Sequence, residues 1–95
     1  MIEQAQYYKL VRQYAEKAPV WDSQRILYQT LPDERWDLTL VAFRVYGDRN
    51  EWPTVMAAAG LDRVSDELPE QVLVLPNQQL MLAFKEQAGI STGGF

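Results

Sequence analysis

The spacing of apolar residues along the chain predicts helices and strands in a defined order. Between residues 2 and 18, apolar and tyrosine side chains recur every three or four positions, which indicates an amphipathic helix that ends before Pro19. Residues 25–30 (RILYQT) alternate two sets of side chains and are rich in β-branched and aromatic types, which favours a strand.

A buried helix is expected over residues 38–46, where only two side chains are polar. Its start is open at this level, because Asp33 or Asp37 can each accept hydrogen bonds from the first helical turn. Gly47 is placed to take the left-handed conformation that closes a helix.

A second central helix is expected to end at Gly60. Asp48 or Asn50 can cap it, and Pro53 then falls in its first turn, where no backbone N–H is needed. Apolar residues at helical spacing form one expected buried stripe: Trp52, Val55, Met56 and Ala59.

The last third of the chain predicts one more strand and one more helix. Val72–Leu75 lacks polar alternation, so we expect both faces of this strand to be covered. Asn77 is placed to cap a helix over residues 78–88 that stops at Gly89.

These elements predict one α+β domain with a strand-helix-helix-strand core and a helix at each end. We divide the chain into an N-terminal helix and linker (1–24), a core (25–76), and a C-terminal helix and tail (77–95). The tyrosine-rich face of the first helix packs either on the core or on another protein, and Trp21 either packs against the domain edge or anchors a partner.

Composition excludes several function classes. The net charge is −4 without a basic cluster, which argues against a nucleic-acid partner. The chain has no histidine and no cysteine, so Ser-His or Cys-His catalysis, disulfides, and ordinary zinc or copper sites are excluded. No apolar run approaches the ~20 residues that span a bilayer, and no signal peptide is evident, so we expect no membrane partner and a cytoplasmic site of synthesis.

No motif predicts an enzyme, a cofactor site or a metal site. Asp33, Glu34 and Asp37 suit acid–base or metal chemistry, but their place at a helix N-terminus explains them without it. The acidic segment 62–70 lacks the ligand pattern of a calcium loop. Three aromatic residues suggest a sugar-stacking platform: Trp36, Tyr46 and Trp52. The pattern places Tyr46 and Trp52 at buried helix positions, which favours the core for them.

Three segments in this order resemble the lysin-motif (LysM) domain: Tyr28-Gln29-Thr30, Val45-Tyr46-Gly47 and the stretch 68–76 (LPEQVLVLP). The resemblance implies a βααβ core over residues 25–76 with a two-stranded antiparallel sheet. The helices at both ends lie outside it.

More specifically, residues 35–38 (RWDL), 42–48 (AFRVYGD) and Trp52 look like the LysM-like proteins of contractile phage tails. Those proteins belong to the baseplate wedge or hub or link the tail tube to the baseplate. The resemblance implies a virion structural protein of the tail baseplate, assembled in the host cytoplasm, present in several copies of a symmetric assembly and bound to other tail proteins (tube, hub, wedge or sheath initiator).

Two departures argue against glycan binding. Residues 59–62 (AGLD) replace the asparagine-rich segment of sugar-binding LysM domains, and Glu70 replaces the glycine of their Pro-Gly turn. A LysM module that binds peptidoglycan or chitin stays the alternative function, and a cytoplasmic adaptor is a weaker third one. For the structural role we expect the partner contacts at the chain's less patterned parts: Tyr7, Tyr14, Trp21, Asp62, Asp66 and Phe95.

Overall fold

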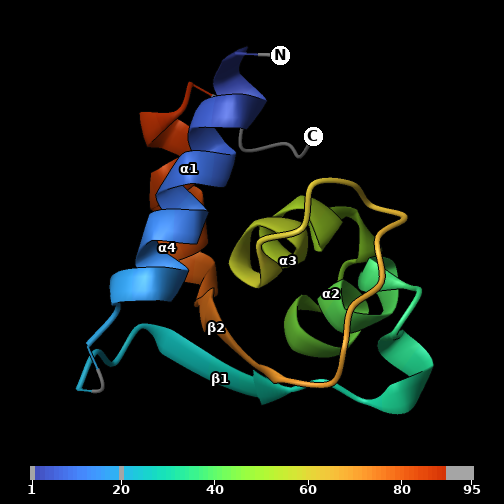
Figure 1. Ribbon diagram of the computed structural model, residues 1–95. Helices are drawn as coiled ribbons and strands as arrows, with labels where there is room; N and C mark the ends of the chain where they lie inside the picture. The colour runs from blue at the N-terminus through green and yellow to red at the C-terminus, as the bar shows by residue number, and fades with distance from the viewer. Residues whose placement is uncertain (1, 20, 90–95) are drawn as a thin grey trace.

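A computed structural model describes residues 2–19 and 21–89 of the chain. Within these residues, four α-helices and a two-stranded antiparallel sheet form an α+β domain (Figure 1). The elements follow the expected order: α1 (Ile2–Lys17), β1 (Arg25–Gln29), α2 (Leu38–Tyr46), α3 (Trp52–Ala59), β2 (Val72–Pro76) and α4 (Gln78–Gln87). Two short 3-10 helices, η1 (Pro32–Glu34) and η2 (Arg49–Glu51), precede α2 and α3.

Local capping chemistry sets the ends of the two central helices. The Asp37 carboxylate accepts a hydrogen bond from the Leu40 N–H at 3.2 Å, so α2 begins after Asp37, while the segment around Asp33 forms η1. Gly47 and Gly60 both have φ near +74° and close α2 and α3 as expected.

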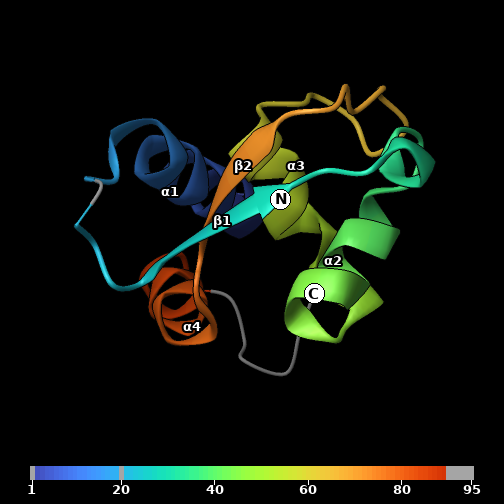
Figure 2. The ribbon, with the colours of Figure 1, turned by 90° about the horizontal axis from the view of Figure 1, so that it is seen from below.

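The sheet has one covered face and one exposed face, which corrects the expectation that both faces of β2 are covered. Leu73 and Leu75 point toward the helices and are buried, whereas Val72 is 55% exposed. On the same outward face, Leu27 of β1 lies opposite Val74 and is 56% exposed. Figure 2, seen from below, shows the reason: the helices lie behind the two strands, and no helix lies in front of them.

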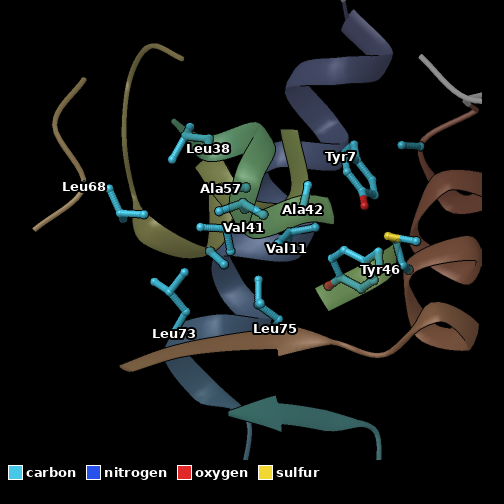
Figure 3. Close-up of a cluster of buried hydrophobic side chains, with 14 residues drawn as sticks. Tyr7, Val11, Leu38, Val41, Ala42, Tyr46, Ala57, Leu68, Leu73 and Leu75 are labelled. Carbon is cyan, nitrogen blue, oxygen red and sulfur yellow. The ribbon is translucent and has the colours of Figure 1, made fainter. Parts of the chain in front are cut away.

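The core lies between this inner face and the helices, and all four helices contribute to it (Figure 3). The first helix supplies two of its buried side chains, and the last helix and its C-cap supply two more: Tyr7, Val11, Met81 and Ala88.

The N-terminal helix packs on its own domain, where it contacts α3, β2 and α4. Arg12 donates a hydrogen bond to the Ala58 carbonyl at 3.0 Å, which places a cation at the C-terminal end of α3, where the helix dipole favours positive charge. The Tyr8 hydroxyl donates to the Leu61 carbonyl at 3.0 Å. These contacts decide the open question about the tyrosine-rich face in favour of the chain's own core.

The C-terminal helix is joined to the centre of the domain by a buried ion pair. The Lys85 ammonium group lies 2.8 Å from both carboxylate oxygens of Glu51, which immediately precedes α3. Both side chains are almost completely removed from solvent.

Truncation of Val11 tests whether α1 belongs to the folding unit. We expect Val11→Ala to lower the free energy of unfolding by about 2 kcal/mol, because it removes buried methyl groups and leaves a cavity. Val64→Ala is the matched control, since Val64 is 44% exposed, and its effect should stay within about 0.5 kcal/mol. Equal effects in urea denaturation would show that α1 is not part of the core.

Removal of one partner of the buried ion pair should be strongly destabilising. Glu51→Gln leaves Lys85 without this carboxylate in a dry site, and we expect a loss of about 3 kcal/mol in the free energy of unfolding. The double variant Glu51→Gln/Lys85→Met should recover most of that loss, because it removes the buried charge as well. A single variant as stable as the wild type in the same denaturation assay would contradict this role.

Candidate functional site: the exposed β1 surface

Tyr7 lies in the core and is not offered to a partner, which corrects its expected role. Its side chain is 1% exposed, and its hydroxyl lies 2.5 Å from the hydroxyl of Thr54 on α3. Burial raises the pKa of the Tyr7 phenol well above its ordinary value, and the nearby Glu51 carboxylate raises it further. The pair ties α1 to α3 within the interior.

Tyr14 is half-buried and serves a contact within the domain. Its hydroxyl donates to the Asp22 carboxylate at 2.9 Å, and its ring meets the Phe84 ring edge-on at a centroid distance of 5.8 Å. Burial and this hydrogen bond raise the pKa of Tyr14 to about 12. Tyr14 therefore links α1 to α4 and to the turn before β1.

The acidic segment is organised by one of its own carboxylates. Asp66 accepts hydrogen bonds from the backbone N–H groups of Asp62 and Arg63 at 3.2 and 3.1 Å, which closes a tight loop. The Asp62 side chain is exposed. Phe95, the last expected contact, lies outside the described residues.

The carboxylates before α2 hold the connection between β1 and α2. Glu34 is fully buried and accepts hydrogen bonds from the Tyr28 hydroxyl, the Leu31 N–H and Arg44 at 2.5, 2.6 and 2.9 Å. Arg44 also donates to Asp33 from both terminal guanidinium nitrogens, and this hydrogen bonding lowers the pKa of Asp33. These contacts give the carboxylates a structural use.

Asp37 also has a structural role, at the start of α2. Hydrogen bonds from the Thr39 hydroxyl and the Leu40 N–H, with Arg49 close by, lower the pKa of Asp37. Among the residues that the structure describes, no group of three or more acidic side chains is arranged to hold a metal ion.

The three candidate aromatic residues do not form one platform. Tyr46 is buried, and its hydroxyl donates to the Pro76 carbonyl at 2.7 Å. Trp52 is half-buried and lines a pocket of about 120 Å³ together with Tyr8. Trp36 is 67% exposed. Tyr46 and Trp52 therefore belong to the core or its border, as expected.

Exposed apolar side chains gather along one strand and its ends. Of the eight large apolar side chains that are exposed in the described part of the chain, five come from β1, its flanking connections or its partner strand. We call these five residues the β1 surface: Trp21 (83% exposed), Leu27 (56%), Leu31 (44%), Trp36 (67%) and Val72 (55%). Exposed apolar residues that follow one element indicate an interaction site more strongly than scattered ones do.

The backbone around Trp36 is held in place by the neighbouring loop. The Leu68 N–H donates to the Arg35 carbonyl at 2.7 Å, and Arg35 pairs with Glu67 at 3.3 Å. At the end of β1, the Thr30 hydroxyl accepts a hydrogen bond from the Gln71 N–H at 2.8 Å. The β1 surface is therefore carried by an ordered backbone, which lowers the entropy lost on binding.

Sequence reasoning identified Trp21 as a candidate contact but missed the rest of this surface. The signal for Leu27 was present, because it alternates with Ile26 and Tyr28 along the strand. Val72 was assigned to a covered face. Trp36 was considered only as part of a sugar-stacking platform; it precedes the helix cap and lies outside the helical pattern.

Comparison of the chain with protein-family models, with curated proteins and with solved structures gives no match. A search of residues 2–19 and 21–89 for bilayer-crossing helices finds none with the required length and apolar character.

The cap at α2 generates a pH-dependent prediction. We expect Asp37→Ala to lower the free energy of unfolding by about 1 kcal/mol at pH 7, because the helix loses its N-cap. The native pKa of Asp37 is depressed, so its contribution is complete above the ordinary value of 3.8 and is lost as the pH falls through the native value. The difference between variant and wild type should therefore shrink as the pH falls from about 5 to about 2.

Asp62→Ala is the matched control, because the Asp62 side chain is exposed and lies outside the helices. Its effect in thermal denaturation should stay within about 0.5 kcal/mol at every pH. A difference for Asp37→Ala that is constant across this pH range would contradict the role of the ionised cap.

Proposed function

We propose that this chain is a non-enzymatic structural component of a bacteriophage tail baseplate, built on a LysM-like core, and that its β1 surface binds a neighbouring tail protein. The exposed β1 surface is the observation that carries the binding role. The phage assignment rests on the resemblance of residues 35–38, 42–48 and Trp52 to tail proteins.

The composition of the β1 surface suits a protein partner. Trp21 and Trp36 are the two most exposed large apolar side chains of the described chain. Tryptophan is enriched at interface hot spots, where its truncation typically costs 2 kcal/mol or more of binding free energy, or roughly 30-fold in affinity. Most polar side chains near this surface already make hydrogen bonds or ion pairs within the domain.

The division between structural and binding residues is consistent with this proposal. Tyr7 and Tyr14 hold the N-terminal helix against the domain, while Trp21 follows that helix and stays exposed. A rigid domain with exposed aromatic residues on ordered connections can join neighbours without a hinge or a catalytic centre.

Particle incorporation tests the proposal. In the phage or tail-like particle encoded together with this chain, we expect the chain at a fixed copy number in purified, salt-washed tails, measured by quantitative mass spectrometry. We expect the double variant Trp21→Ala/Trp36→Ala to fold normally and to lose incorporation at least tenfold, because it removes the two aromatic anchors of the β1 surface.

Leu82→Ala is the control variant, because Leu82 is 41% exposed and belongs to α4, not to the five residues of the β1 surface. It should enter particles at the wild-type level. A chain that is absent from washed tails overturns the phage role, and a double variant that incorporates as well as Leu82→Ala overturns the role of the β1 surface.

Exposure of Trp36 supports one alternative, a LysM module that binds peptidoglycan or chitin. An indole ring on an ordered loop can stack on a sugar ring. Under this alternative, chito-oligosaccharide at millimolar concentration should shift the amide signals of residues 35–38 and should shift them less in Trp36→Ala. Absence of any shift would remove it.

A further inference from the structure

The hydrogen-bond pattern of the sheet fixes which backbone groups of β1 face outward. The Thr30 N–H donates to the Gln71 carbonyl at 2.9 Å, and the Asn77 N–H donates to the Gln24 carbonyl at 2.8 Å. Hydrogen-bonded pairs alternate with non-bonded pairs along an antiparallel ladder. Positions 24, 26, 28 and 30 therefore face β2, and the N–H and C=O groups of Leu27 and Gln29 face away from it.

This outer edge of β1 is open from Leu27 to Gln29, whereas at the start of the strand the Arg25 N–H donates to the Asp22 carbonyl at 3.2 Å. Among the described elements, β1 makes its extensive contacts with β2 alone. Its sequence, RILYQ, has neither proline nor lysine, and its register with β2 runs without a bulge. Natural sheets block free edges with such features, because an open edge pairs with another strand. The edge of β2 is different. Pro76 has no N–H group, and the Pro76 carbonyl accepts a hydrogen bond from the Tyr46 hydroxyl. The β2 strand also packs against α1, α3 and α4.

We propose that the β1 edge pairs with the β1 edge of a second copy of this chain, antiparallel and about a two-fold axis at Leu27. The two sheets then form one continuous four-stranded sheet, β2-β1-β1-β2. The proposal names the partner of the β1 surface and so rests on that surface being an interface, but it does not depend on the phage assignment.

The register about Leu27 is self-complementary. Leu27 lies opposite Leu27 of the second copy, and each copy's Arg25 lies opposite Gln29 of the other, so no like charges face each other. On the exposed face, Val74 and Leu27 of both copies form one apolar row, because Val74 lies opposite Leu27 within each copy. Antiparallel pairing also brings the turn with Trp21 to the end of the sheet that holds Trp36 of the second copy.

The size of the contact predicts a weak, concentration-dependent dimer. Only the five residues of β1 and its flanking connections contribute to the contact. A standard stable interface uses roughly 800 Å² per partner, so the area buried by this short strand is expected to be smaller. Dimers should therefore populate at high micromolar to millimolar concentration and dissociate on dilution.

Amide hydrogen exchange of the wild-type protein tests the pairing residue by residue. We expect the amides of Ile26 and Tyr28 to exchange slowly at all concentrations, because they already bond to β2. The amides of Leu27 and Gln29 should exchange quickly in dilute protein and about two- to threefold more slowly at 1 mM, where a dimer of this strength is about half populated. Exchange of Leu27 and Gln29 that is as fast at 1 mM as in dilute protein overturns the proposal.

A disulfide trap tests the symmetry, since the chain has no native cysteine. Opposed residues of a hydrogen-bonded pair lie about 5.5 Å apart between Cα atoms, which a disulfide can bridge. Leu27→Cys should form a covalent dimer under mild oxidation at least tenfold faster than Leu82→Cys, the exposed control on α4. Equal rates overturn the proposal even if the exchange test succeeds, because they exclude the two-fold at Leu27.

Two lysine variants provide a matched pair. Leu27→Lys sets two like charges opposite each other and should weaken dimerisation at least tenfold in analytical ultracentrifugation. Val72→Lys has nearly the same exposure and the same sheet face but lies on β2, and it should weaken dimerisation less than threefold. Equal weakening by both variants overturns the proposal.

These outcomes are independent of particle incorporation. A monomeric chain whose tryptophan variants still fail to enter tails would sink the self-pairing and leave the proposed function intact. A chain that dimerises through β1 but is absent from tails would support the self-pairing and overturn the proposed function.

Discussion

The buried ion pair between Glu51 and Lys85 is the constraint on which the arrangement of the domain depends. Two opposite charges are removed from water where α4 meets the start of α3, and their approach to 2.8 Å offsets much of the cost of burying them. The phenol of Tyr7 and the hydroxyl of Thr54 pair with each other in the same interior. This polar centre therefore requires α1, α3 and α4 to be present together.

It follows that the strand-helix-helix-strand segment is not a complete unit by itself. The proposed LysM-like core would span residues 25–76, yet the inner face of the sheet is also covered by α1, and Glu51 pairs with Lys85 of α4. A chain without its first 18 residues loses Val11 and Tyr7 from the core together with the cap that Arg12 provides to α3. The end helices are parts of the fold and not attachments to it.

Local chemistry made much of this fold predictable from the sequence. The left-handed residues Gly47 and Gly60 and the cap residue Asn77 each act within one or two turns of chain, so short-range patterns identify them. The pairing of Glu51 with Lys85 joins residues 34 positions apart, and no local pattern carries that information. The exposure of Val72 was missed for a related reason. A run of apolar residues indicates an apolar strand, but it does not show whether helices cover one face of the sheet or both.

The candidate site was less predictable than the fold, because it consists of what the fold leaves uncovered. In the described residues every buried side-chain nitrogen or oxygen has a hydrogen-bond partner, so the polar chemistry is used in holding the domain together. Apolar side chains are left exposed, since Leu27 and Val72 lie on an open sheet face, and the backbone groups of Leu27 and Gln29 face away from β2. A further strand at the β1 edge supplies hydrogen-bond partners for these backbone groups and extends the apolar row on the open face. The open edge therefore predicts that its occupant is a strand.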